Sequence, residues 1–288
     1  MPAATATPPL VLTIAGFDPT AGAGIAADLK TFAANHTYGL ACITCLTVQN
    51  TRAARAYRPV DADLLEQQLD WLLSDVQPRA VKIGMLGTAT VVEVIARQLE
   101  RHPADWVVLD PIAGASHGVA LCDDAAWERM QQRLFPLASV ITPNVAEAER
   151  LTGLTITRPA EMEQAAEMLQ TRGPGYVVVT GGHLERPVDV LYDGNRSIQL
   201  NADRVRTSNT HGTGCTFSAA LAANLAHGKQ VMDAVVQAKA YVTAALKQSY
   251  AIGPGPGPLN HLFRLQEPPA SRNVDPAPGV HDTIAAER

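Results

Sequence analysis

The segment Asn209-Thr-His-Gly-Thr-Gly-Cys-Thr216 joins two glycines and a cysteine to hydroxyl side chains, directly before a long Ala-rich stretch. Gly212 and Gly214 allow successive backbone N–H groups to face one point, and a helix beginning here adds roughly half a positive charge. Such a loop can bind an anion, including a phosphoryl group during transfer. Cys215 would lie in the first helical turn, where the pKa of a thiol falls. We therefore expect an anion site with a reactive thiol rather than a cysteine that only packs.

A second glycine loop, Gly22-Ala-Gly-Ile-Ala-Ala27, matches a relaxed dinucleotide-binding pattern. It fits NAD poorly, because several residues separate it from the preceding apolar strand and no acid lies between Asp28 and Asp61 to hold a ribose. A glycine-rich turn without activity of its own is the plainer alternative. No G-x-x-x-x-G-K-[ST] motif occurs in the chain, so phosphate binding must use another site.

Two acidic segments follow predicted strands. In Thr142-Pro-Asn-Val-Ala-Glu147, Asn144 and Glu147 lie three apart on one helical face, and their oxygens suit the water shell of Mg²⁺. The same spacing also produces an N-terminal capping box, which leaves the alternative of a purely structural pair open. Asp110, directly after Leu109, would point into the ligand crevice of a parallel sheet, or would merely cap a turn.

Short apolar runs alternate with helical patterns over most of the chain, and this rhythm predicts a mostly parallel sheet with helices on both faces. Most glycines then fall where a strand or loop meets a helix, at the edge where such sheets bind ligands. Further along, Asp193-Gly194-Asn195 predicts a β-hairpin at the edge of the sheet. The expected strands are 10–15, 42–48, 80–83, 106–109, 139–141, 176–180, 188–192 and 197–200, and the expected helices are 24–34, 62–74, 88–101, 124–134, 145–151, 160–171, 214–226 and 231–249.

The composition limits the class of protein. The 288 residues are 47% hydrophobic, which allows a sizeable core without disulfide or metal staples. The net charge of −5 disfavours a general electrostatic grip on nucleic acid or on an anionic membrane. No apolar run reaches the roughly 18 residues of a membrane span, and the first residues lack a signal-peptide pattern. We therefore expect a cytoplasmic protein with no nucleic-acid or membrane partner.

Cys42 and Cys45 form a C-x-x-C pattern that invites a redox or zinc interpretation. They lie in an apolar strand, where residues three apart face opposite sides, and no second pair follows at zinc-finger spacing. We expect two small core residues.

One domain is expected over residues 10–265, after a flexible N-terminus at 1–9. Gly253-Pro-Gly-Pro-Gly-Pro258 would end the last helix, and the Pro-rich segment 266–288 is typical of a disordered tail.

Together, these motifs resemble the hydroxymethylpyrimidine/phosphomethylpyrimidine kinases of thiamin biosynthesis, within the ribokinase-like superfamily. The two glycine loops at this separation are a specific signal, and the resemblance covers nearly the whole expected domain. The strings that carry it are Thr13-Ile-Ala-Gly-Phe-Asp-Pro-Thr-Ala-Gly-Ala-Gly24, Ala27-Asp-Leu-Lys-Thr-Phe32, Thr47-Val-Gln-Asn-Thr51, Val81-Lys-Ile-Gly-Met-Leu86, Thr142-Pro-Asn144, Gly181-Gly-His183, residues 209–216, and Gly255-Pro-Gly-Pro-Leu-Asn-His261.

The resemblance implies a ribokinase-like three-layer αβα sandwich with a central, mostly parallel sheet and an antiparallel edge. It also implies a kinase that uses ATP and Mg²⁺ to phosphorylate 4-amino-5-hydroxymethyl-2-methylpyrimidine, and then converts the monophosphate to the diphosphate. Relatives of this kind are commonly homodimers.

Residue by residue, the resemblance assigns three groups of positions. The first group binds the pyrimidine. It includes the Gln49 amide and the Asp28 carboxylate, which suit an aminopyrimidine because that ring has acceptor nitrogens and an amino donor. The pyrimidine would contact Ala23, Asp28, Gln49, Met85 and Ile112; the catalytic base would be Cys215; and ATP and its phosphates would contact Asp110, Asn144, Glu147, Gly181, Gly182, Thr210, Gly212, Thr213 and Gly214, with Asp110 and Glu147 attending Mg²⁺ through water.

Several positions depart from the family pattern. Thr180 stands where the family usually has a lysine before Gly-Gly-His, and the segment after Asp110 has no cation except His117. Phe17 and Ala21 replace smaller residues in the first loop. The phosphate half is therefore expected to be short of cations, while Lys82 is either a structural charge on its strand or part of the site.

Three alternatives remain at this point. Relatives with the same cysteine loop phosphorylate pyridoxal or pyridoxine, and the loss of lysine at Thr180 would suit a non-catalytic pyrimidine-binding relative. A thiol hydrolase that uses Cys215 and His211 is disfavoured, because no third group that would orient the histidine is apparent.

Overall fold

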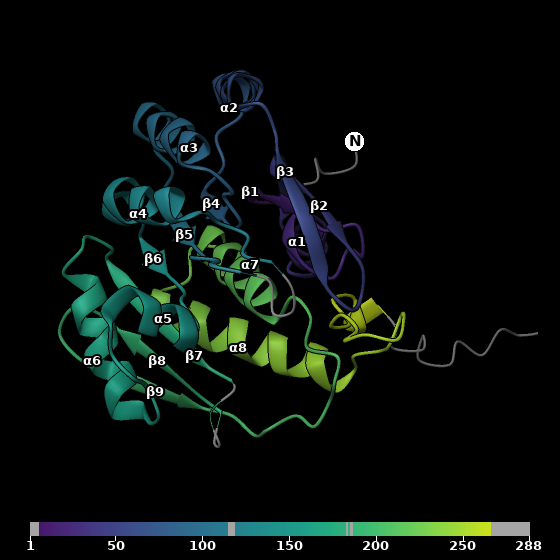
Figure 1. The fold of residues 1–288 in the computed structure, drawn as a ribbon, viewed down its shortest axis with the longest axis vertical. Coiled ribbons are helices and arrows are strands. Elements are labelled where there is room, and N and C mark those ends of the chain that lie inside the picture. Colours follow the sequence, from purple (N-terminus) through teal and green to yellow (C-terminus); the bar gives the residue numbers. More distant parts are fainter. Residues whose placement is uncertain (1–5, 115–118, 183, 185–186, 266–288) are drawn as a thin grey trace, which may run out of the picture.

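The fold is built on a nine-stranded sheet in a computed structural model, which describes residues 6–114, 119–182, 184 and 187–265 (Figure 1). The strand order is β3-β2-β1-β4-β5-β6-β7-β8-β9. The strands are β1 Leu10–Phe17, β2 Tyr38–Gln49, β3 Ala54–Pro59, β4 Ala80–Ile83, β5 Trp106–Leu109, β6 Val140–Ile141, β7 Tyr176–Gly181, β8 Val188–Tyr192 and β9 Ser197–Asn201.

Helices cover both faces of this sheet (Figure 1). One face packs against α2 to α6 and the other against α1, α7 and α8, so two separate apolar cores flank the strands. The helices are α1 Gly24–Ala34, α2 Ala62–Asp75, α3 Ala89–Arg101, α4 Asp124–Arg133, α5 Val145–Thr152, α6 Pro159–Gln170, α7 Thr213–Ala226 and α8 Val231–Lys247, with short 3₁₀ turns at Phe135–Leu137 and Phe263–Leu265.

The strand directions confirm the expected fold class. Strands β2, β1, β4, β5, β6 and β7 run parallel to one another, and β8, which is antiparallel to β7, forms the predicted antiparallel hairpin with β9. Because the central strands are parallel, their carboxyl ends share one edge of the sheet, where loops can assemble a site.

Each expected strand and helix is found with its bounds changed by only a few residues, but β3 was not expected. It pairs antiparallel with β2 at the far edge of the sheet. Its sequence, Ala-Arg-Ala-Tyr-Arg-Pro, is half polar because only one side has a neighbouring strand. Pro59 is tolerated there since an edge strand can lose a ladder hydrogen bond.

Cys42 and Cys45 are buried core residues, as predicted. They belong to different apolar clusters on opposite sides of β2, and burial raises the pKa of each thiol to about 11. Helix α7 is buried nearly all round, because it lies between the sheet, α1 and α8, and this explains its run of Ala and Leu.

No helix in the described ranges is long and apolar enough to cross a membrane. The predicted tail at 266–288 lies outside the described residues, as do His117 and His183 and the start of the N-terminal segment.

Candidate active site

The two glycine loops, residues 22–27 and 209–216, are far apart in the sequence but pack directly against each other. Gly212 has a φ of +81°, and a Cβ atom there would overlap the carbonyl oxygen of Gly22. A Cβ atom on Gly22 would in turn overlap the ring of His211. Glycine permits this approach because it has no Cβ atom and adopts positive φ without strain. As a result, α1 and α7 begin close together at the carboxyl edge of the sheet.

Cys215 lies in the first turn of α7, between these helix starts, and is buried. Burial raises the pKa of its thiol to about 12, with Asp110 and Asp28 adding to the rise, while Lys82 and a hydrogen bond from the backbone of Gly24 oppose it. The expected lowering of this pKa is therefore wrong. A helix N-terminus contributes only a partial charge, and here it is outweighed by desolvation and by carboxylates from other elements.

Lys82 and Asp28 form a fully buried ion pair with an Nζ–Oδ2 distance of 2.9 Å. Thr13 Oγ1 donates to the same carboxylate oxygen at 2.6 Å, whereas Oδ1 of Asp28 has no hydrogen-bond partner among the described residues. Burial alone would lower the pKa of Lys82, but Asp28, with Cys215 and Asp110, raises it well above its usual range. The carboxylate of Asp28 thus favours the charged form of Lys82. A lone lysine in an apolar strand is itself a signal, since a buried charge must be paired.

Asp110 follows β5 and is buried with hydroxyl partners. Ser218 Oγ donates to its Oδ2 at 3.1 Å and Thr142 Oγ1 donates to its Oδ1 at 3.5 Å. A Cβ atom on Gly214 would lie 3.9 Å from Oδ2, so the cysteine loop borders this carboxylate. Burial raises the pKa of Asp110 to about 6, against the opposing effects of Lys82 and the hydroxyls.

Glu147 is the second acid on this side of the site. Burial, and then the charge of Asp110, raise its pKa to about 8. Its Oε2 accepts from the backbone N–H of Asn144, and Asn144 Oδ1 accepts from the backbone N–H of Glu147, each at 2.9 Å. The capping-box alternative is therefore present in the structure, and any metal role would be added to it.

This pair of acids fits Mg²⁺ better than a metal that needs a complete protein cage. No cluster of three or more His, Cys, Asp and Glu side chains suited to a metal ion occurs within the described ranges. Mg²⁺ keeps several waters and uses one or two carboxylates together with substrate phosphates. Two buried carboxylates with raised pKa values, Asp110 and Glu147, match that requirement, because a bound cation would relieve their repulsion.

The end of β7 lies beside the acid pair. The backbone N–H of Thr180 donates to Pro143 O at 2.9 Å, which brings the predicted glycine pair next to the Asn144 loop. The N–H of Gly181 donates to Asp189 Oδ1 at 3.1 Å, and a Cβ atom there would overlap Val188 O. Packing therefore accounts for Gly181, while Gly182 faces open space.

The hydroxyl residues of the cysteine loop shape its turn. Thr213 Oγ1 donates to Thr210 O at 2.7 Å, and the N–H of Thr213 donates to the same oxygen at 3.3 Å. Gly214, one residue further, is exposed. Hydrogen bonds within the loop thus fix its conformation, and Gly214 remains at the surface.

The predicted pyrimidine contacts come from several strand ends and loops. Met85 and Ile112 pack in one small apolar cluster with Cys45, Ala54, Leu121 and Tyr57. Ala23 is the N-cap residue of α1, and Gln49 ends β2. The structure therefore brings these residues to the edge expected from the sequence.

Asp18 is a site residue that the sequence analysis missed. Its carboxylate accepts from the backbone N–H groups of Thr20 and Ala23 at 2.9 and 3.0 Å and lies 2.7 Å from Nε2 of His211. Burial opposes ionisation, but the hydrogen bonds with His211 and Thr20 outweigh it and lower the pKa of Asp18. His211 therefore has an orienting acid after all, and its ring also contacts the Gln49 amide at 3.3 Å.

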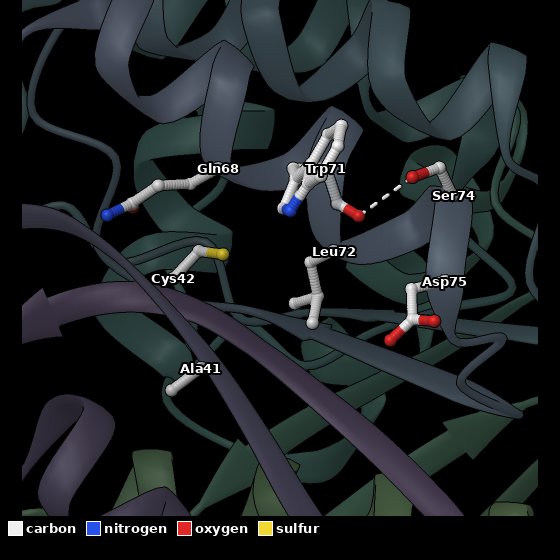
Figure 2. A pocket seen from close by; sticks show the side chains of 7 residues that line it. All are labelled: Ala41, Cys42, Gln68, Trp71, Leu72, Ser74 and Asp75. Atoms are coloured by element: carbon white, nitrogen blue, oxygen red, sulfur yellow. Dashed lines mark hydrogen bonds between the residues drawn. The ribbon is translucent and has the colours of Figure 1, made fainter.

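A separate hollow of about 740 Å³ lies between β2 and α2, away from these residues (Figure 2). None of the predicted site residues lines it, and the Ser74 hydroxyl in its wall already donates to Trp71 O at 2.8 Å. Its lining is Ala41, Cys42, Gln68, Trp71, Leu72, Ser74 and Asp75. The site is therefore assigned by the convergence of polar groups at the strand ends and not by this hollow.

Comparison with known proteins agrees with this geometry. A family model described as phosphomethylpyrimidine kinase matches residues 18–260. A hydroxymethylpyrimidine/phosphomethylpyrimidine kinase of Rhizobium meliloti is 44% identical over 260 residues, which cover 88% of this chain and 97% of the relative. The thiamine biosynthesis bifunctional protein ThiED of Geobacter sulfurreducens is 42% identical over 89% of this chain, which spans only 53% of that longer protein.

Among solved structures, the pyridoxal kinase from Staphylococcus aureus in complex with ADP superposes with a TM-score of 0.84 at 35% identity. The match covers 91% of this chain and 96% of that one.

Proposed function

The chain belongs to the phosphomethylpyrimidine kinase family, and we propose that it transfers the γ-phosphoryl group of ATP to the hydroxymethyl group of 4-amino-5-hydroxymethyl-2-methylpyrimidine. The same site would then phosphorylate the monophosphate to the diphosphate for thiamin biosynthesis. The observation that carries this proposal is the position of Cys215. It lies in the first turn of α7, next to the start of α1, with Lys82, Asp28 and Asp110 close enough to act on its thiol.

Different residues would orient the pyrimidine and bind the transferred phosphoryl group. Gln49 and Asp28 would orient the pyrimidine, with Met85 and Ile112 as the apolar wall. The first N–H groups of α7 have no acceptor inside the helix, and those that follow Thr213, whose N–H already donates to Thr210 O, would donate to the oxygens of the transferred group. Phosphoryl transfer has a loose transition state and relies on positioning and charge stabilisation.

Cys215 would take the proton of the substrate hydroxyl at its Sγ. With a thiol pKa of about 12, the thiolate is scarce before substrates bind, so additional positive charge is needed to activate it. Lys82 supplies part of that positive charge, which lowers the pKa of the thiol. Asp110 and Glu147 would hold Mg²⁺, which when bound neutralises the charge of the ATP phosphates.

A parallel assay tests this proposal. The purified protein with Mg²⁺ and ATP is offered hydroxymethylpyrimidine, its monophosphate and pyridoxal in separate reactions, and ADP release above an acceptor-free control is measured. Release with the first two is expected. ADP release with none of the three would overturn kinase function and favour a binding protein, and release with pyridoxal alone would overturn the choice of substrate.

Pyridoxal kinase activity is not favoured, since the curated relatives at 40–44% identity carry the pyrimidine-kinase name. A homodimer in the cytoplasm, with no nucleic-acid partner, stays a prediction.

A further inference from the structure

Three polar side chains from distant parts of the chain meet beside the two glycine loops. Asp18 follows β1, Gln49 ends β2, and His211 precedes α7. Nε2 of His211 lies 2.7 Å from Asp18 Oδ2 and 3.3 Å from the near end of the Gln49 amide, where the nitrogen Nε2 is placed. The histidine side chain is 19% exposed and the aspartate side chain 4%, so the contacts are shielded from solvent.

The neighbours decide which atom is the donor. Asp18 already accepts three hydrogen bonds from Thr20 and Ala23, and an ionised carboxylate can only accept. Nε2 of His211 must therefore carry the hydrogen and donate it to Asp18. A ring nitrogen that bears hydrogen has no lone pair left, so it cannot accept from an amide N–H of Gln49.

The Gln49 amide is satisfied only if its carbonyl oxygen faces the histidine. The two ends of a glutamine amide have the same shape, and the hydrogen-bond network assigns them. With the amide oxygen of Gln49 at 3.3 Å from Nε2, the Nε2–H group of His211 can donate to both Asp18 and Gln49. No N–H group of Gln49 then faces the N–H group of His211. The NH₂ group of Gln49 then lies on the side away from His211.

This assignment gives the pyrimidine side a fixed order of donor and acceptor. Gln49 offers N–H, and the unpartnered Oδ1 of Asp28 offers a buried acceptor. A 4-aminopyrimidine presents the complementary pair, because a ring nitrogen acceptor stands beside an amino donor.

We propose that His211, oriented by Asp18, is a positioning residue that locks the Gln49 amide with its nitrogen toward the substrate and so selects rings with an acceptor nitrogen beside an amino group. The inference rests on the proposed function, in which Gln49 contacts the ring. The backbone supports it, since the N–H of His211 donates to Gly257 O at 3.1 Å, and the close packing of its ring explains the glycine at position 22.

A double-mutant cycle tests the inference on the full chain. His211→Phe keeps a ring but removes the N–H, so it should raise the KM for the pyrimidine about 3–10-fold, the effect of one hydrogen bond, with little change in kcat. In a Gln49→Ala background the same substitution should have no further effect on KM. His211→Gln, which keeps a donor N–H, should restore much of the lost affinity. Equal losses in both backgrounds, or no rescue, would overturn the positioning role.

A second measurement does not depend on activity. In the wild-type protein labelled with ¹⁵N-histidine, NMR should show His211 with hydrogen on Nε2 at neutral pH, with the His211→Gln spectrum providing the assignment. An unprotonated Nε2 would overturn the inference.

The two proposals fail in different ways. A wild-type chain that phosphorylates no pyrimidine overturns the proposed function and the selection with it. An active chain with an additive cycle overturns the inference alone.

Discussion

The buried carboxylates around Cys215 differ in their partners. In the pyrimidine half, burial raises the pKa of Asp28 but the cation of Lys82 opposes that rise, and hydrogen bonds from His211 and Thr20 lower the pKa of Asp18 despite its burial. On the phosphate side, burial and the charge of Asp110 raise the pKa of Glu147 to about 8.

This difference indicates which half of the site is complete in the folded chain. In the pyrimidine half each carboxylate has a basic partner, Lys82 for Asp28 and His211 for Asp18, and so this half can be rigid before any substrate arrives. The phosphate half holds two acids that repel each other, and a cation would stabilise them. The following predictions test this contrast, from the largest expected effect to the smallest.

Cys215 lies at the boundary between the halves, and its removal should have the largest effect. Cys215→Ala should lower the single-turnover rate by about 10²–10⁴-fold, the usual contribution of a general base, while ATP binding persists. Rapid-quench kinetics and nucleotide titration measure the two quantities. Cys42→Ala, at a buried thiol on β2 far from the loops, is the matched control. An unchanged single-turnover rate in Cys215→Ala would refute the base assignment.

Breaking the ion pair of the pyrimidine half should strongly destabilise the fold. Lys82→Met leaves the Asp28 carboxylate buried without its cation, which typically costs about 3–5 kcal/mol. Urea unfolding measures the loss. Lys82→Met combined with Asp28→Leu should recover most of the stability but not the activity, because the Lys82 charge also acts on Cys215. If Lys82→Met is as stable as the wild type, the pair is not the source of rigidity proposed here.

The acids of the phosphate half predict the opposite dependence on pH from Asp18, whose pKa is lowered. The pKa values of Asp110 and Glu147 rise from 3.8 and 4.5 to about 6 and about 8 on folding. The folded chain therefore binds more protons than the unfolded chain, and its stability falls as pH rises through these values. At about 1.4 kcal/mol for each tenfold change in acid strength, the loss should reach several kcal/mol by about pH 8.

Urea unfolding at a series of pH values, without Mg²⁺ and ATP, measures this slope. Glu147→Gln should flatten it, whereas Glu128→Gln, at an exposed position on α4, should leave it unchanged. A slope that is the same in Glu147→Gln and wild type would show that the buried acid is not its cause.

The contrast between the halves was only partly predictable from sequence. Glycine loops and acids at strand ends are local features, so Gly212 and Asp110 lie at the start of a helix and at the end of a strand, as expected. The roles of Asp18 and Lys82 depend on partners from other elements, which no local pattern reveals. The predicted direction of the Cys215 pKa was wrong for the same reason. The groups that raise this pKa, apart from burial itself, are Asp110 and Asp28, which belong to other elements.

The strands of the sheet were also only partly predictable from the sequence. The regular alternation of strand and helix predicted the parallel centre of the sheet, and Asp193-Gly194-Asn195 predicted the β8–β9 hairpin. Strand β3 has no such rhythm, because it is a polar edge strand that is defined by its pairing with β2.

Both halves depend on the contact between the glycine loops, and two glycines allow a matched test. Gly212 and Gly228 share a φ of +81°, but Gly228 has no atom within 4 Å of an added Cβ. Alanine at either position has a left-handed backbone penalty of about 1–2 kcal/mol. Gly212→Ala should lose an additional 1–3 kcal/mol, about the cost of overpacking, together with activity. Equal unfolding free energies for the two variants would show that the loop contact adds nothing to stability.

The smallest effect should come from adding a charge to the phosphate half. Thr180 lies at the end of β7, next to the Asn144 loop, at the position where the resemblance to the family implies a lysine. Thr180→Lys should lower the KM for ATP about 2–5-fold, because an ion pair near the surface is worth at most about 1 kcal/mol. Thr180→Gln has a long polar side chain without the charge and should leave KM unchanged. The neighbouring Asp189 is already paired with Lys239 at 2.6 Å, so the new ammonium group is free to act on phosphate. A KM that does not fall would mean that the acid pair and its cation determine nucleotide affinity without help from this strand.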